Sequence, residues 1–195
     1  MRMKRAGKNI ATLVMVLLLA LTVACAPLPE EVTSPLTPAV ERGIIEIRVT
    51  DPPPPGVENA IVTVTKIEVH RVWDEEGAWE TIFEDADGVT FDLVKVFENP
   101  TVIAYVEVMV GGFTQIRMEV TEVVVTPVGG DPVSAIIPSG ELKIVRPFNV
   151  EAGMRTILTL DFDGDKSIKI KTIGGKDEFL FNPVVKLLIE KQKVE

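Results

Sequence analysis

Residues 43–56 read GIIEIRVTDPPPPG, and they decide the fold class. Apolar side chains at Ile45, Ile47 and Val49 alternate with polar ones, and alternation with a period of two is typical of a β-strand that buries one face. Four prolines at residues 52–55 then end the strand, because proline has no N–H group to donate to a sheet. The stretch therefore predicts a strand followed by a stiff, exposed connection.

The same alternation recurs along the rest of the chain, and glycine-rich turns separate the runs. The expected strands cover residues 60–73, 79–83, 101–110, 114–126, 133–137, 142–148, 155–163, 166–173 and 179–190. A change of parity near Thr65 and Lys66 predicts that one of them contains a bulge or changes sheets. The run FDLVKVFE at residues 91–98 fits either one helical turn or a short strand. So many short strands without a helical stripe predict an all-β sandwich or barrel.

Composition narrows the range of functions that the chain could have. The chain has 195 residues, of which 46% are apolar and 25% charged, so it can form a packed core. It carries 20 Lys and Arg against 29 Asp and Glu, a net charge of -9. That balance argues against a nucleic-acid partner, which needs a basic surface. A single Cys excludes an intramolecular disulfide, and a single His excludes a multi-histidine metal centre.

The N-terminus has the composition of an export signal. A basic run, MRMKRAGK, precedes fifteen uncharged residues at 10–24, which is short for a bilayer span of about 20 residues. Next, Thr22-Val23-Ala24-Cys25 resembles the bacterial lipobox, although Thr22 stands where leucine is usual. In that motif the Cys becomes the lipid-bearing first residue of the mature chain. The alternatives are an uncleaved membrane anchor and ordinary cleavage at Ala24-Cys25-Ala26.

These features predict three parts. Residues 1–24 are expected to be a signal peptide. Residues 25–42 are expected to be a lipidated Cys25 and a tether, because four prolines in residues 26–42 favour an extended chain. Residues 43–195 are expected to form a single β-sandwich domain. The predicted location is outside the cytoplasm, at the cell membrane or cell surface, with the lipid as the contact to the membrane.

Several short motifs, taken in order, resemble the domain-of-unknown-function family 4382, whose members are secreted bacterial and archaeal domains that often carry lipoprotein signals. They are IRVTDP at 47–52, VTKIEVH at 64–70, GAW at 77–79, FDL at 91–93, FTQIRM at 113–118, IPSG at 137–140, LDFD at 160–163 with Ser167-Ile168, and NPVVK at 182–186. The resemblance implies an antiparallel β-sandwich of the prealbumin-like or immunoglobulin-like kind. It implies no activity and no site residues. The four-proline run departs from the family's shorter Asp-Ala-Pro loop.

Three acids surround Gly164 in the run DFDGDKS at residues 161–167. Calcium prefers several carboxylate and carbonyl oxygens, so Asp161, Asp163 and Asp165 are weak calcium candidates. No glutamate follows at the spacing of a calcium loop, and Asp-Gly is typical of turns. We therefore expect a hairpin turn, with no metal site favoured and no cofactor.

Aromatic side chains are the candidates for ligand stacking. Trp73, Trp79 and Tyr105 could stack on sugars or peptide rings, but Trp73 and Trp79 flank a turn and could equally form a cross-strand pair that stabilises a hairpin. His70 is expected to be an ordinary strand residue. Residues 115, 117 and 119 share one strand face, which we interpret as the solvated side of a sheet rather than a binding face.

The function expected from the sequence is noncatalytic. We expect a lipid-anchored extracytoplasmic binding or adhesion module, or an accessory of the cell envelope, with an envelope protein or a carbohydrate as its partner. The alternatives are an acid-dependent hydrolase of the cell envelope and a purely structural envelope lipoprotein. Two convergent carboxylates in a deep cleft would favour the enzyme, whereas exposed aromatic residues or an open sheet edge would favour binding.

Overall fold

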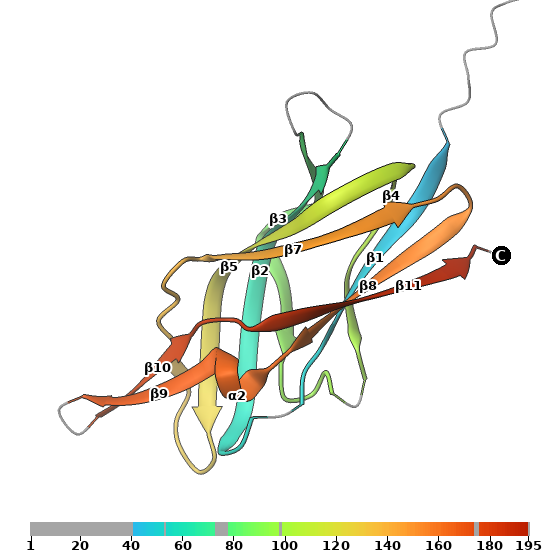
Figure 1. Ribbon diagram of the computed structural model, residues 1–195. Helices are drawn as coiled ribbons and strands as arrows, with labels where there is room; N and C mark the ends of the chain where they lie inside the picture. Colours follow the sequence, from blue (N-terminus) through green and yellow to red (C-terminus); the bar gives the residue numbers. More distant parts are fainter. Residues whose placement is uncertain (1–40, 53, 73–77, 98, 174–175, 195) are drawn as a thin grey trace, which may run out of the picture. The chain divides into compact units, whose positions relative to one another are not determined.

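The computed structural model describes residues 41–52, 54–72, 78–97, 99–173 and 176–194 (Figure 1). Within them the chain is almost entirely β-structure, as predicted, with a single helical turn. The elements are β1 (Arg42–Thr50), β2 (Val57–Arg71), β3 (Trp79–Asp92), β4 (Thr101–Met109), β5 (Gly111–Pro127), β6 (Val133–Ser134), β7 (Glu141–Val150), β8 (Met154–Phe162), α2 (Gly164–Ser167), β9 (Ile168–Ile173), β10 (Lys176–Phe181) and β11 (Val185–Lys193).

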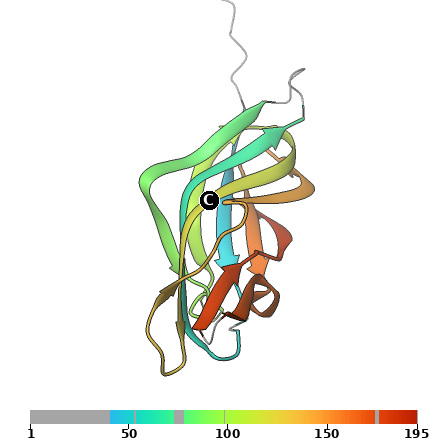
Figure 2. The same cartoon turned by 90° about the vertical axis from the view of Figure 1, so that its left-hand side faces the viewer.

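Two sheets form the sandwich. One has the strand order β11-β8-β1-β4, and the other has the order β3-β2-β5, with β6 and β7 both pairing with β5. Figure 2 shows β2 and β3 in one layer and β1 and β8 in the other. The strand pairs are antiparallel apart from β1 and β8, which run parallel. The predicted antiparallel β-sandwich is therefore confirmed, with one parallel pair inside it.

The core lies between the two sheets and follows the alternation of the sequence. Ile45, Ile47 and Val49 of β1 are fully buried, and so are Ile67 and Ile116 of the opposite sheet. All five belong to one apolar cluster. Burying a side chain of this size contributes about 1.5–3 kcal/mol to folding, so the period-two pattern fixes which face of each strand turns inward.

A bulge interrupts β2 where the sequence changes parity. The register shifts between Val64 and Lys66 against both neighbouring strands, which confirms the predicted bulge. Opposite it, Gly88 of β3 has φ +73°, and a Cβ placed there would lie 2.8 Å from the carbonyl oxygen of Val64. Glycine is therefore required where β3 bends past the bulge.

Two sequence predictions differ from the structure at strand ends. Residues 91 and 92 end β3, and residues 93–97 are neither a strand nor a helix but a hydrogen-bonded turn, closed by Val96 N–H donating to Asp92 O (3.1 Å). The single strand predicted at residues 179–190 is wrong, because the chain breaks at Pro183 into β10 and β11. β10 pairs with β9 in a separate two-stranded sheet, whereas β11 pairs with β8, so the chain changes sheets at Pro183, which has no N–H group to donate.

The proline-rich connection between β1 and β2 is only partly exposed. Pro52 and Pro55 are exposed, but Pro54 is buried, which corrects the predicted exposed stretch. The ring of Pro54 packs close to Gly164, whose added Cβ would lie 3.0 Å from Pro54 Cδ. The connection is thus part of the packing at this end of the sandwich.

Candidate functional site

Polar side chains lie in a row on the solvent side of the sheet that contains β2 and β5. The buried faces of these strands carry apolar residues, so every second residue points outward. Glu68 of β2 lies opposite Arg117 of β5 on one side and Thr81 of β3 on the other. Arg117 in turn lies opposite Lys143 of β7. The alternating sequence and the register together place these groups in one row across four strands.

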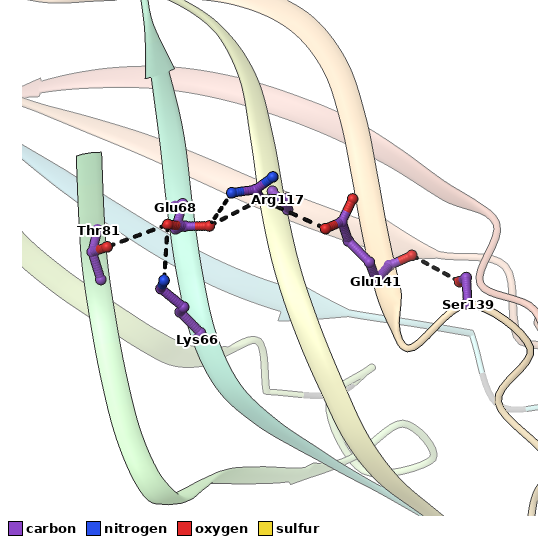
Figure 3. Close-up of polar contacts among 6 residues, drawn as sticks. All are labelled: Lys66, Glu68, Thr81, Arg117, Ser139 and Glu141. Atoms are coloured by element: carbon purple, nitrogen blue, oxygen red, sulfur yellow. Dashed lines mark hydrogen bonds and ion pairs between the residues drawn. The ribbon is translucent and has the colours of Figure 1, made fainter. Parts of the chain in front are cut away.

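Glu68 is the centre of this row (Figure 3). Its Oε2 accepts hydrogen bonds from Nε (2.9 Å) and Nη2 (2.6 Å) of Arg117, and its Oε1 lies 3.0 Å from Lys66 Nζ and 3.4 Å from Thr81 Oγ1. Only 9% of Glu68 is exposed. Burial alone raises the pKa of this carboxyl group, but the hydrogen bonds from Arg117 and Lys66 outweigh it and hold the pKa below its ordinary value.

Trp79 stands beside this carboxylate and is held in place by cations. The Arg117 guanidinium carbon lies 4.2 Å from the centre of the indole ring, and Lys143 Nζ lies 6.0 Å from it. The ring of His70 meets Trp79 edge-on at 5.1 Å, and His70 Nδ1 lies 2.9 Å from Thr114 Oγ1. Arg117 therefore joins the carboxylate and the indole into one rigid unit.

A shallow hollow of about 430 Å³ opens over these groups. Its lining comprises Lys66, Glu68, Arg117, Glu119, Ser139, Gly140 and Glu141, and we call it the Glu68–Arg117 hollow. The turn before β7 forms one wall: Ser139 Oγ donates to Glu141 O (2.9 Å), and Val120 N–H donates to Gly140 O (2.8 Å). Glu141 Oε2 lies 3.6 Å from Arg117 Nε. The hollow thus offers carboxylate acceptors and cationic donors side by side.

A second hollow, of about 500 Å³, lies on the other sheet and is lined by Tyr105, Arg155, Gln192, Lys193 and Val194. Tyr105 is 58% exposed. Beneath the hollow, the buried carboxylate of Glu46 forms ion pairs with Arg48 and with Arg155, whose Nη1 lies 3.1 Å from Glu46 Oε2. This carboxylate offsets the charges of Arg48 and Arg155, and Tyr105 and Val194 supply the large exposed apolar side chains of the hollow.

A third group of polar residues surrounds Asp51 at the end of β1. Asp51 is fully buried; its Oδ1 accepts from Gly164 N–H (2.9 Å), and its Oδ2 has no partner among the described residues. Burial raises the pKa of Asp51 to about 7; the Gly164 hydrogen bond opposes this, and Asp161, Asp163 and Asp165 add to it. Asp51 is sealed from solvent, so it cannot itself touch a ligand.

Of the three predicted calcium candidates, Asp163 has a structural role. Asp163 caps α2, because its Oδ1 accepts from Lys166 N–H (3.2 Å) and its Oδ2 pairs with Lys166 Nζ. In the part of the chain that the structure describes, no three His, Cys, Asp or Glu side chains gather in a way that could hold a metal ion. The predicted hairpin turn is wrong: the capped helical turn joins β8 to β9, which belong to different sheets and do not pair with each other.

Comparison with known proteins places this sandwich in a family. The profile of a family described as a domain of unknown function, DUF4382, matches residues 42–183. The chain belongs to the DUF4382 family. No curated protein matches it.

A solved structure from Bacteroides eggerthii DSM 20697, provisionally named a cell adhesion protein, is similar to this DUF4382 chain at 13% identity and a TM-score of 0.33. The similarity covers 78% of this chain and 55% of that one, so the chain spans about half the length of its neighbour. The family match extends over most of the sandwich, whereas this structural likeness is distant.

The DUF4382 domain does not bring the predicted aromatic candidates together. Trp79 and Tyr105 lie on different sheets, and Trp73 and Cys25 lie outside the described residues. None of the described helical residues makes a segment that could cross a bilayer.

The sequence analysis found the Arg117 face but missed its partner Glu68. The signal was available: Lys66, Glu68 and His70 alternate with buried residues in β2, just as residues 115, 117 and 119 do in β5.

Proposed function

We propose that this DUF4382 domain is a noncatalytic binding module of the cell exterior and that the Glu68–Arg117 hollow binds carbohydrate. The observation that carries the proposal is the mixture of groups in the hollow. Glu119 and Glu141 offer carboxylate acceptors, Lys66 and Arg117 offer donors, and the indole of Trp79 lies alongside. Sugar hydroxyl groups both donate and accept hydrogen bonds, so a neutral glycan can bond to the acceptors and to the donors of this surface.

The rigidity of the hollow supports binding. Arg117 is already fixed by Glu68 and stacked on Trp79, so a ligand does not have to order its side chain. Ordering a long side chain on binding costs about 0.5–1.5 kcal/mol, and a preorganised surface avoids that cost. The turn at 139–141 is likewise tied to β5 by the bond from Val120 N–H.

The hydrolase alternative is less well supported by the charges of the hollow. Acid-dependent hydrolysis of glycosides needs a carboxyl group that still holds a proton when the substrate binds. The pKa of Glu68 is held low by Arg117 and Lys66, so this group is a carboxylate at neutral pH. Among the described residues, the carboxyl group whose pKa is raised is that of Asp51, and it is fully buried elsewhere. These two observations favour binding over catalysis.

We also propose that the domain is exported and held at the membrane by a lipid on Cys25, with residues 26–42 as a tether. The support is the sequence of the N-terminus, together with the family resemblance. A net charge of -9 repels anionic lipid headgroups, so a covalent lipid would be needed to keep the domain at a membrane. Such a tether would leave the hollow free to meet glycans of the envelope.

The test of carbohydrate binding is titration calorimetry of the full exported chain with chitotetraose and with neutral oligosaccharides of the cell envelope. We expect at least one sugar to bind, and we expect Glu119→Gln and Glu141→Gln each to weaken it about tenfold by removing one charged acceptor. Glu122→Gln, on the same strand as Glu119 but outside the hollow, is the matched control. Unchanged affinity in both hollow variants, or no binding of any sugar, would contradict the proposal.

A further inference from the structure

Strand β4 is an open edge of its sheet. It pairs with β1, and among the described residues no other strand pairs with it. Three of its nine residues are large exposed apolar side chains: Val102 is 47% exposed, Tyr105 58% and Met109 45%. Its only charged residue is Glu107. Exposed apolar side chains on an unpaired edge favour the addition of another strand.

The backbone groups that remain free on this edge can be assigned from the register. Val110 N–H donates to Glu41 O (3.0 Å). The backbone N–H and C=O groups of Val110 and of every second residue before it therefore point toward β1. The backbone N–H and C=O groups that point away from β1 are those of Tyr105, Glu107 and Met109. The Met109 carbonyl accepts from Arg71 Nη2 (3.1 Å). The open part of the edge is thus centred on Tyr105 and Glu107.

Strands β11, β7 and β3 are also edges, and each carries features that hinder pairing, as edges usually do. Strand β11 has the lysines Lys186, Lys191 and Lys193, and Arg146 Nη1 donates to its Leu187 carbonyl (2.7 Å). Strand β7 contains Pro147 among charged residues. Strand β3 is rich in acids and has irregular register. On β4 the comparable feature is a bulge at Ile103, which leaves residues 104–109 regular.

We propose that the chain forms a dimer in which β4 pairs antiparallel with β4 of a second copy, so that the two sheets become one. A second copy fits because the edge is complementary to itself. With Val106 on the two-fold axis, Tyr105 lies opposite Glu107 of the second copy, and both residues turn free backbone groups toward the partner strand. An axis at Glu107 would place two glutamates face to face, and an axis at Tyr105 would use the bulged Ile103.

The test is the mass of the full exported chain, purified in excess detergent and measured by light scattering during gel filtration. We expect the parent to be a dimer. Tyr105→Glu should yield monomers, because in this register it places two like-charged pairs across the axis. Tyr105→Lys should keep the dimer, because lysine then faces Glu107. The double variant Tyr105→Glu/Glu107→Lys should restore the dimer that the single glutamate variant loses.

Equal melting temperatures of the variant and the parent, measured at a dilution at which the parent is also monomeric, check that the exposed position tolerates the change. A monomeric parent, a dimeric Tyr105→Glu variant, or loss of the dimer in Tyr105→Lys would overturn the proposal. A different polypeptide held on β4 would overturn it as well. These outcomes are independent of sugar binding, because Tyr105 lies on the sheet opposite the Glu68–Arg117 hollow.

Discussion

At the scale of single residues, Asp51 shows how burial can make an acid costly. Its carboxyl group is fully buried, one oxygen is bound by Gly164 N–H, and the other lacks a partner among the described residues. Removing a carboxylate from water is expensive unless both oxygens are paired, so burial raises the pKa of this group to about 7. Above that pH the native state must carry the charge.

Asp51→Asn is therefore expected to stabilise the domain at pH 8. In the unfolded chain Asp51 has an ordinary aspartate pKa of 3.8, whereas in the native state its pKa is about 7. Between these values the native state binds more protons, so this group makes the unfolding free energy fall as pH rises, and the full cost is present above pH 7. Each tenfold difference in proton affinity is worth about 1.4 kcal/mol. Urea unfolding at pH 4 and pH 8 measures the difference from the parent.

Asp163→Asn is the control, and its expected effect on stability at pH 8 has the opposite sign. The hydrogen bond from Lys166 lowers the pKa of Asp163, so the stability that Asp163 contributes is present at neutral pH and lost as the solution becomes acidic. This variant should be less stable than the parent at pH 8, and the gap should close toward pH 3. If Asp51→Asn is no more stable than the parent at pH 8, burial of that charge is not costly.

The Glu68–Arg117 pair is expected to be strongly coupled. Arg117→Leu leaves a nearly buried carboxylate with fewer partners, so it should cost about 1–3 kcal/mol, and much of that cost should vanish in a Glu68→Gln background. Chemical unfolding of the parent, the two single variants and the double variant gives the coupling energy. The surface pair Lys191–Glu151 serves as the control, with a coupling below about 1 kcal/mol. Additive effects at Glu68 and Arg117 would show that the two side chains act independently.

At the scale of the element, the sequence predicted strands well and their ends less well. The alternation at Ile45, Ile47 and Val49 is local, so one strand is enough to read it. The break at Pro183 depends instead on which sheet each half joins, and Ser167 settles that by bonding the chain on both sides: Asn182 N–H donates to its carbonyl and Val184 N–H to its hydroxyl. Such long-range partners are absent from any local window of sequence.

The same distinction applies to the site. Residues 115, 117 and 119 could be assigned to one face from alternation alone, but the pairing of Arg117 with Glu68 depends on the register between β2 and β5. That register includes several bulges, which the sequence signals only at Thr65 and Lys66. Asp51 was missed because Asp before Pro at a strand end is typical of a turn, and nothing nearby shows that the turn is buried.

Gly88→Ala tests the bend of β3 over the β2 bulge. Alanine must adopt φ +73°, and its Cβ would lie 2.8 Å from the Val64 carbonyl oxygen, so we expect a loss of about 1–3 kcal/mol. Gly129→Ala is the matched control, because Gly129 has φ +74° but no atom within 4 Å of the added Cβ. Thermal unfolding should show a clearly larger loss at Gly88. Equal losses would mean that the backbone angle alone matters and that the close approach does not.

At the scale of the whole molecule, the sandwich keeps three features apart. The Glu68–Arg117 hollow occupies the outer side of one sheet, Tyr105 and the open edge of β4 belong to the other, and Asp51 lies buried where β1 ends. A binding surface and a pairing edge on different sheets can operate at once. The proposed dimer through β4 would therefore leave the proposed binding surface on the other sheet free.

Cys25→Ser tests the proposed membrane attachment. We expect the parent to take up radiolabelled palmitate and to sediment with membranes, and the variant to lose the label completely, because serine offers no thiol for acylation. Thr22→Leu, which restores the usual residue of the lipobox, is the control and should keep both properties. Label or lipid-dependent sedimentation that persists in Cys25→Ser would show that the chain is held in another way.

Nitrogen-15 NMR of the exported chain, recorded during titration with a sugar that binds in calorimetry, locates the ligand directly. If the Glu68–Arg117 hollow binds carbohydrate, the amide signals of Lys66, Arg117 and Gly140 shift in proportion to occupancy, while that of Tyr105 stays in place. Shifts confined to the Tyr105 side of the sandwich, or no saturable shift at Arg117, would contradict binding at this hollow.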